Sequence, residues 1–333
     1  SIDVIEGPSS GVTGTNNTKN EGGTINLSSK RAVSVPITRA TLRWSSKNAI
    51  EESIDVGRRF GDKDRYGVRI NASNVTGERA VDHWNLKQRN IYLNLDQKTD
   101  RMRTNYLLGF THTASIGRPY GFSLDNMYAG NNIPAATRGS NNYNPKWRED
   151  RNTNLVMTLN HEMDLHKHLT AFLNAGHFKQ DWYYYIGFSK KLLNENGDFK
   201  ASADNYSLIE KRDYIQLGLR GDFRTGTCKH QYTVAVDRQW EWYGTTSGLK
   251  TITDGWFGNL YHGDSAQFTQ PDLPQADAHY TYKDRLSGWS VTDTITACDD
   301  KLTILLGLGG KSIEMDRYNF DGTHKKKSGS YYA

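Results

Sequence analysis

Two short motifs bring together residue types that can do chemistry. Residues 307–312 read Gly-Leu-Gly-Gly-Lys-Ser, similar to the end of a phosphate-binding loop, but the first glycine of that pattern would stand where the chain has Leu305. His161, Glu162 and His166 approach a zinc-protease motif, in which the second histidine would come one residue earlier. Both motifs need a helix, whereas both segments have the alternation of strands. We therefore predict no enzyme, no catalytic residues and no metal bound by protein side chains.

Aromatic residues are the stronger candidates for binding. The chain has 8 Trp, 19 Tyr and 11 Phe, with dense runs at 182–185 and 240–243, each ending a strand. Such rings either form the belt at a membrane–water interface or stack on a planar or catecholate ligand, and both interpretations stay open for 182–185. Trp240 and Trp242 continue the apolar face of their strand and fit the belt, which leaves Tyr243 on the opposite face. The candidate ligand-binding residues are Tyr120, Tyr143, Trp147, Trp182, Tyr183, Tyr184, Tyr185, Tyr243 and Trp256.

The segments that must position these residues alternate apolar and polar side chains. Period two is typical of strands whose faces meet different surroundings. No stretch reaches the roughly 18 consecutive apolar residues of a spanning helix, and no amphipathic helix of four turns is evident. The sequence predicts an all-β, mainly antiparallel fold with about eleven strands. The alternation is found at 40–44, 68–73, 91–96, 104–113, 153–162, 169–178, 215–223, 232–239, 287–297 and 302–309.

The connections between these strands are of two kinds. Short polar turns lie at 61–64, 96–101, 164–168, 224–227 and 299–301. Between them fall long aromatic and Asn/Gly-rich connections, at about 75–86, 114–150, 182–212, 243–284 and 316–330. Alternating short and long connections are typical of a transmembrane barrel, with short turns on one rim and long loops on the other. A hydrophobic content of 36% also fits, because one face of each strand would line a polar lumen.

Basic and thiol side chains add two hypotheses at the rims. The Lys325, Lys326 and Lys327 run, in the last long connection, is either solvated or in contact with lipopolysaccharide phosphates. Cys228 and Cys298 both fall at the short-turn rim of neighbouring strands, where a disulfide could form. By alternation, Cys228 continues the outward face of its strand and Cys298 the inward face of the other, which opposes a bridge. Strand ends can depart from this alternation, so both outcomes stay open. No nucleic-acid partner is expected.

Three motifs at the start of the chain do not read as barrel strands. They are Ile-Asp-Val-Ile-Glu-Gly-Pro at 2–8, Gly-Val-Thr-Gly at 11–14 and Gly-Gly-Thr-Ile-Asn-Leu-Ser-Ser-Lys-Arg at 22–31. In this order they resemble the end of the plug domain of TonB-dependent outer-membrane receptors. Further on, Asn-Ile-Pro-Ala at 132–135 and Asn-Tyr-Asn-Pro-Lys-Trp at 142–147 are similar to the ferric-siderophore branch of that family.

The resemblance implies an architecture. The fold would be an antiparallel transmembrane β-barrel, present in part as about eleven strands of a 22-stranded barrel, preceded by the last segment of a plug domain. The plug segment would occupy 1–36 and the first part of the barrel 37–333. Thr13 stands where the family usually has a tyrosine, so a ligand contact from that turn is not expected. Because family members are about twice this length, we expect a middle part of such a receptor, with unpaired edge strands.

The resemblance also implies a function. It is TonB-dependent active transport of a ferric siderophore through the outer membrane of a Gram-negative bacterium. The implied partners are the ferric siderophore, TonB with its inner-membrane energising complex, outer-membrane lipid and lipopolysaccharide. No cofactor is implied, because the iron would travel as the siderophore chelate. The alternatives are a passive outer-membrane porin and a soluble all-β carbohydrate-binding module with an exposed aromatic platform.

Overall fold

The architecture is that of a long antiparallel sheet with a small second sheet. The computed structural model describes residues 2–6, 23–124, 132–246, 256–262, 268–272, 277–297, 301–319 and 321–332. The small sheet pairs β1 (Ile2–Glu6) with β2 (Gly23–Leu27). The strands of the large sheet are β3 (Ile37–Ser45), β4 (Ala49–Phe60), β5 (Tyr66–Glu78), β6 (Asn85–Lys98), β7 (Met102–Ile116), β8 (Glu149–His166), β9 (Leu169–Leu192), β10 (Asp198–Thr225), β11 (Cys228–Thr246), β12 (Phe257–Asn259), β13 (Ala278–Ala297), β14 (Leu302–Tyr318) and β15 (His324–Tyr332).

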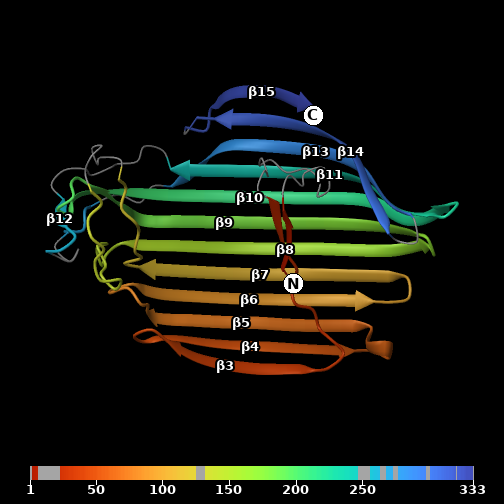
Figure 1. Ribbon diagram of the computed structural model, residues 1–333, viewed down its shortest axis with the longest axis horizontal. Helices are drawn as coiled ribbons and strands as arrows, with labels where there is room; N and C mark the ends of the chain where they lie inside the picture. The colour runs from red at the N-terminus through yellow and green to blue at the C-terminus, as the bar shows by residue number, and fades with distance from the viewer. Residues whose placement is uncertain are drawn as a thin grey trace.

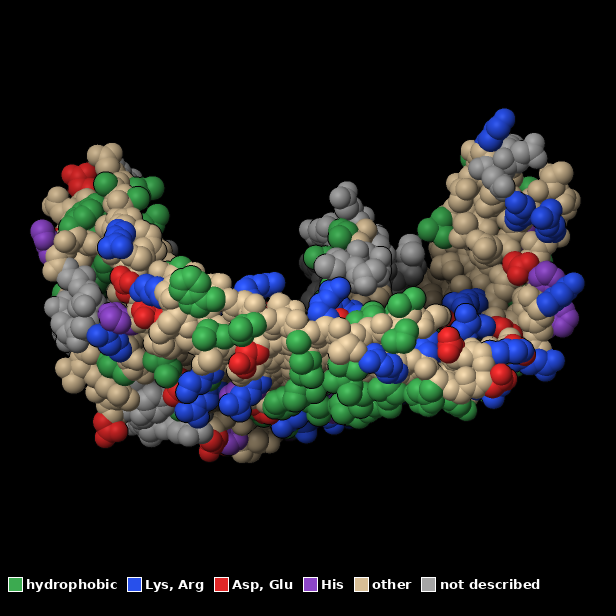
Figure 2. Space-filling view, turned by 90° about the horizontal axis from the view of Figure 1, so that it is seen from below, with side chains coloured by type: hydrophobic (Ala, Val, Ile, Leu, Met, Phe, Trp, Pro, Cys, Tyr) green, Lys and Arg blue, Asp and Glu red, His purple; other side chains and the backbone are tan. Residues whose placement is uncertain are grey.

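The large sheet is an open meander. Each strand from β3 to β15 pairs antiparallel with the next in sequence, except that β11 pairs directly with β13 while the short β12 pairs with β10. Figure 1 shows the strands side by side in this order, with the β1–β2 pair crossing over them, and Figure 2 shows that they curve into a trough. In the described residues β3 and β15 are the two ends of the sheet. The predicted all-β, antiparallel, partial barrel is confirmed.

No helix in the described part is long and apolar enough to cross a membrane.

The sheet has an apolar outer face and a polar inner face. On β10, Leu217 is 51% exposed and pairs with Val236 of β11 and Leu173 of β9. Residues paired directly share a face and successive residues alternate, so Gln216 points the other way, where it accepts a hydrogen bond from Asn174 Nδ2 at 2.9 Å. Figure 2 shows the hydrophobic band along the convex side. Directly paired polar residues cross the inner face in one row, namely Asn105, Asn160, Asn174, Gln216 and Asp237.

Three of the predicted long connections are wrong. The segment 182–212 is mostly strand, because β9 runs on to Leu192 and β10 begins at Asp198, leaving residues 193–197 as the connection. Likewise β5 and β6 are joined by 79–84, and β14 and β15 by 319–323, so Lys325, Lys326 and Lys327 lie on β15 and not in a loop. Where a strand extends past the membrane, its backbone hydrogen bonds continue, but it no longer needs an apolar face toward lipid. The hydrophobic alternation therefore stops before the strand does. Between the described strands of the large sheet, the long connections are 117–148 and 247–277, and the second contains β12.

Sequence alternation also missed β4. Its outward residues Ile50, Ile54 and Val56 are interrupted by Glu52, and Arg58 continues the same side. These two charged residues break the run of apolar outward positions, so the sequence of β4 shows no clear alternation. β4 is nonetheless bonded along its length, to β3 on one side and β5 on the other.

Candidate ligand-binding site

A row of aromatic rings crosses the inner face of the sheet at its loop end. On β9 the rings of Trp182 and Tyr184 are 4.7 Å apart, and Tyr184 is 5.2 Å from Tyr206 on β10. The hydroxyls of Tyr206 and Tyr243 of β11 are 3.1 Å apart, and Tyr243 stacks on Tyr282 of β13 at 4.9 Å with 11° between ring planes. The cross-strand register brings these residues together, since Tyr206 pairs with Tyr184 and Tyr243 with Tyr282. We call these five residues the aromatic row.

Two guanidinium groups lie close to the aromatic row. The Arg317 guanidinium carbon lies 4.9 Å from the ring centroid of Tyr282, and its Nη2 donates to Asp284 Oδ2 at 3.3 Å. Arg212 Nη2 is 3.2 Å from Glu241 Oε1. Asp284 and Glu241 are buried, whereas both arginine side chains stay at least a third exposed. Flat rings, hydroxyls and accessible guanidinium groups together suit a planar, oxygen-rich and anionic ligand.

A polar trough begins at the other end of the aromatic row. Trp182 Nε1 donates to the buried Asp150 at 3.1 Å, and Arg118 Nη1 donates to the other carboxylate oxygen at 3.0 Å. From there a trough of about 770 Å³ covers the inner face of β3–β9. Its lining is mainly amide, hydroxyl and charged side chains, among them Asn152 and Asn154, with apolar ones such as Ile54 and Ala72. A ligand held on the rings would therefore lie above a hydrophilic wall.

Sequence reasoning found part of the aromatic row. It placed Trp182, Tyr184 and Tyr243 among the candidates, and the structure brings these three onto one surface. It missed Tyr206 and Tyr282. Tyr282 is directly paired with Tyr243 across β11 and β13 and therefore lies on the same face. This pairing could not be predicted, because the sequence does not show where the long 247–277 connection ends.

The neighbours of Tyr184 in the 182–185 run have other positions. Tyr183 pairs with Arg151 of β8, whose side chain is on the convex face, so Tyr183 also faces outward. The backbone of Tyr185 belongs to β9, but its side chain lies outside the described residues. Alternation thus divides this run between the two faces. Ligand contact by either residue stays a prediction.

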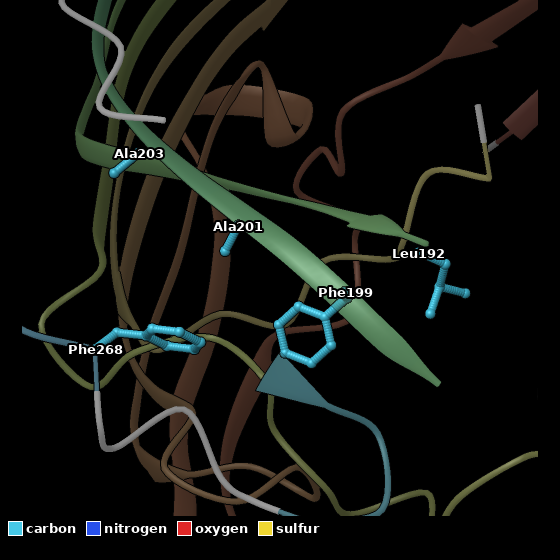
Figure 3. Close-up of a cluster of buried hydrophobic side chains, with 5 residues drawn as sticks. All are labelled: Leu192, Phe199, Ala201, Ala203 and Phe268. Carbon is cyan, nitrogen blue, oxygen red and sulfur yellow. The ribbon is translucent and has the colours of Figure 1, made fainter. Parts of the chain in front are cut away.

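Three of the candidate residues pack into a small core formed by the loops. Tyr143, Trp147 and Trp256 pack against a buried cluster at the loop end of β9 and β10. Figure 3 shows the five residues of that cluster. The Tyr143 hydroxyl donates to Leu260 O at 2.9 Å, and Trp147 Nε1 donates to Phe268 O at 2.7 Å. The polar atoms of Tyr143 and Trp147 thus bind loop backbone. The structure assigns these rings to holding the loops together, and ligand contact by them stays a prediction. The buried cluster consists of Leu192, Phe199, Ala201, Ala203 and Phe268.

Tyr120, the remaining candidate, lies over a pair of buried cations. The Arg148 guanidinium carbon lies 4.5 Å from the Tyr120 ring centroid, and Lys190 Nζ donates to Tyr120 O at 3.0 Å. Arg148 and Lys190 are only 1% and 2% exposed. Lys190 also donates to the Asn144 side chain and lies 5.0 Å from the Phe122 ring. Burial and the nearby Arg148 charge lower the pKa of Lys190 from its ordinary value to about 7.

The Lys190 ammonium makes the loop core pH-sensitive. Because its pKa is lowered in the folded state, the unfolded chain binds more protons between pH 7 and the ordinary lysine value, so folded stability rises with pH in that window. We expect the amides of Ser123 and Leu192, which bond across this segment, to exchange hydrogen more slowly at pH 9 than at pH 7 after correction for intrinsic rates. Lys190→Met should flatten this dependence. The same rise in Lys190→Met would contradict the assignment.

The hypothesis of a disulfide concerns the opposite rim. Cys228 carries a free thiol in the structure, and Cys298 lies outside the described residues. The last residues paired between the two strands are Lys229 and Thr296. A bridge between Cys228 and Cys298 stays a prediction, testable by counting thiols on denatured, unreduced protein.

Comparison with known proteins finds siderophore receptors. No family model matches the chain. The ferrichrome receptor FcuA of Yersinia enterocolitica is 28% identical over 315 residues, which cover 94% of this chain and 40% of FcuA. The ferric preacinetobactin receptor BauA of Acinetobacter baumannii superposes with a TM-score of 0.87 and 21% identity over all of this chain and 49% of its own. The ferric-catecholate import receptor Fiu of E. coli K12 gives 0.79 and 16% over 99% of this chain and 50% of its own.

These comparisons agree on architecture and on length. The chain spans about half the length of the solved receptors it matches and less than half of FcuA. Each of the three proteins is described as a receptor. The open sheet of this chain corresponds to part of their barrels. Over 94% of its length, the chain is thus similar in sequence to a ferrichrome receptor, and it has the fold of TonB-dependent siderophore receptors, as part of their transmembrane barrel.

Proposed function

We propose that this chain is part of a TonB-dependent receptor that takes up a ferric siderophore through the outer membrane of a Gram-negative bacterium. The observation that carries the proposal is the aromatic row, an inward-facing surface with accessible guanidinium groups at the loop end of a sheet whose outer face is apolar. The similarity to FcuA and to solved siderophore receptors supports it. Neither a passive porin nor a soluble carbohydrate-binding module finds support in these comparisons.

The aromatic row would hold the chelate and not the bare ion. Its oxygen atoms are tyrosine hydroxyls, of which those of Tyr206 and Tyr243 lie in hydrogen-bond contact, and in the described residues no group of three or more His, Cys, Asp or Glu side chains is placed to bind a metal. In the proposed role iron arrives in its siderophore, and that role involves no protein cofactor and no catalysis. The further partners would be TonB with its inner-membrane energising complex, outer-membrane lipid and lipopolysaccharide.

The start of the chain would serve as the end of the plug. We place the boundary between 1–36 and 37–333, because the segment before β3 is bonded to the inner wall: Arg69 Nη1 donates to Arg31 O at 2.9 Å and Asn94 Nδ2 to Ser29 Oγ at 3.1 Å. These contacts would anchor the plug to the barrel while the rest of the plug responds to TonB.

Removing the middle of the aromatic row should weaken siderophore binding. In the complete receptor, Tyr243→Ala is expected to raise the dissociation constant for a ferric siderophore about tenfold, because a stacked ring contributes about 1 kcal/mol or more. Tyr243→Phe keeps the stack on Tyr282 and should cost less. Quenching of tryptophan fluorescence measures the affinity, since Trp182 lies in the aromatic row. Tyr183→Ala, on the opposite face of β9, tests that candidate separately, and an unchanged affinity would confine binding to the inward-facing rings. Unchanged affinity in a Tyr243→Ala/Tyr282→Ala double variant would contradict this function for the row.

A further inference from the structure

The two ends of the aromatic row have different electrostatic surroundings. The row begins at Trp182 on β9 and ends at Tyr282 on β13, and we call these the β9 end and the β13 end. The charged residues beyond them, Asp150 on β8 and Arg317 on β14, are five strand spacings apart, which makes about 24 Å along the wall at about 4.8 Å each. A ligand that stacks on two or three of the rings therefore contacts one end and not both.

At the β13 end, carboxylates balance the cations. Arg212 Nη2 contacts Glu210 Oε1 and lies 3.2 Å from Glu241 Oε1. Arg317 donates through both terminal nitrogens to Asp284, which is buried. Three carboxylates thus face two guanidinium groups among the described residues, so this end carries no excess of positive charge.

At the β9 end, the described cations outnumber the carboxylates. Asp150 is in contact with Arg118, whose side chain stays 46% exposed. The guanidinium carbons of Arg118 and Arg148 lie 5.6 Å and 4.5 Å from the ring centroid of Tyr120. Arg148 is buried, and its Nε has no hydrogen-bond partner in the described part of the chain. One carboxylate therefore faces two guanidinium groups, and the buried Lys190 near Arg148 adds to the positive side when it is protonated.

Asp150 holds the exposed cation and the first ring of the row together. Its two oxygens accept from Trp182 Nε1 at 3.1 Å and from Arg118 Nη1 at 3.0 Å, and it is only 3% exposed. The backbone of Arg118 is fixed as well, because its carbonyl accepts from Arg148 Nη1 at 3.2 Å and from Asn144 Nδ2. A guanidinium group has several N–H donors and Asp150 engages one of its nitrogens, so exposed donors remain beside Trp182 for a ligand.

We propose that the β9 end selects the charge of the ligand: Arg118, positioned by Asp150 beside Trp182, binds the anionic part of the chelate. This rests on the proposed function of the aromatic row and gives the ligand a direction, with its anionic part toward β8 and its uncharged parts toward β13. The site then prefers an anionic chelate to an uncharged one of similar size, because charge-assisted hydrogen bonds are the stronger ones.

The test compares two probes on the complete receptor, a trianionic iron(III) tris-catecholate and an uncharged iron(III) tris-hydroxamate. Calorimetric titration gives both dissociation constants at about 0.15 M salt, where exposed charges farther apart than about 8 Å are largely screened. The parent is expected to bind the trianionic probe more tightly. Arg118→Gln should weaken binding of the trianionic probe at least about tenfold and that of the uncharged probe less than about threefold, because the lost hydrogen bond is charge-assisted.

Asp150→Asn separates positioning from simple electrostatics. Removing a negative charge would by itself tighten the binding of an anion. We expect the opposite, a loss of about fivefold or more for the trianionic probe, because an amide oxygen holds Arg118 and Trp182 more weakly than a carboxylate does. The uncharged probe should change little, and its binding shows that the variant is folded. A merely structural role of Asp150 would weaken both probes alike.

The matched control is Arg151→Gln, which removes the same charge from the residue after Asp150. Arg151 lies on the convex face and contacts Glu149 at 2.7 Å, so both dissociation constants should stay as in the parent.

Four results would overturn the proposal. They are a parent that does not prefer the trianionic probe, an Arg118→Gln variant that loses neither probe or both equally, tighter trianionic binding in Asp150→Asn, and loss of the preference in Arg317→Gln but not in Arg118→Gln. The double variant Tyr243→Ala/Tyr282→Ala tests the proposed function separately. If it loses both probes while Arg118→Gln keeps the preference of the parent, the row binds the chelate and only the charge selection at the β9 end is refuted.

Discussion

Leu217→Arg is expected to lower the free energy of unfolding of the complete receptor in a bilayer by about 2–4 kcal/mol. Leu217 is half exposed on the convex face between Val236 and Leu173, so an arginine there would meet hydrocarbon. Its neighbour Gln216 faces the lumen, and Gln216→Arg should cost about 1 kcal/mol, the worth of the one amide hydrogen bond to Asn174. Reversible folding into lipid bilayers with urea measures both.

This pair of substitutions isolates one property, the face of the strand, because the two residues are adjacent and receive the same side chain. Similar losses at both positions would mean that β10 does not separate lipid from lumen. Suppose that Leu217→Arg lowers the free energy of unfolding in bilayers but not in micelles of a short-chain detergent. That result would show that the cost comes from placing arginine in the hydrocarbon of the bilayer.

The faces of the strands were predictable because alternation is local. Leu217 and Gln216 differ in polarity, and each strand that meets lipid repeats that difference. Parity alone therefore assigned Tyr243 inward and Trp240 and Trp242 outward, whereas it left the 182–185 run open between the two faces. The prediction failed where strands leave the membrane. In β9 beyond Trp182, and in β10 before Leu208, the strands pack on loops and not on lipid. The apolar alternation there is short, namely Phe199, Ala201 and Ala203, and it belongs to the buried cluster under the loops.

The role of the loop aromatics could not be read from the sequence for a different reason. Trp147 donates to the carbonyl of Phe268, 121 residues away, and Tyr143 to that of Leu260, 117 residues away. Composition marks such residues as binding candidates, but only the long-range contacts show that the rings pack on Phe199 and its neighbours. Tyr206 was missed because 182–212 was predicted as a connection, whereas the residue lies on β10 beside a bulge between Asp204 and Tyr206.

Arg69→Met is expected to destabilise the barrel by about 3–5 kcal/mol, because it leaves a buried carboxylate without its main partner. Arg69 Nε and Nη2 each donate to Asp55 at 2.8 Å, and the side chains are only 10% and 12% exposed. The matched control is Arg43→Met on the neighbouring strand pair. Arg43 reaches Glu51 at 3.1 Å, but these side chains are 64% and 32% exposed, so the expected cost is at most about 1 kcal/mol.

A second variant separates the buried charge from the lost contacts. Asp55→Asn in the Arg69→Met background removes the uncompensated carboxylate and should recover part of the stability, measured by the same bilayer unfolding. Arg69 also holds the Arg31 carbonyl, and Lys30 lies 3.3 Å from Asp55, so the double variant should still loosen the segment that enters β3. Faster proteolysis of that segment in both Arg69 variants, but not in Arg43→Met, would follow from this anchor. If Arg69→Met lowered the free energy of unfolding no more than Arg43→Met, the Arg69–Asp55 ion pair would be screened by solvent. Other residues would then have to anchor the plug segment.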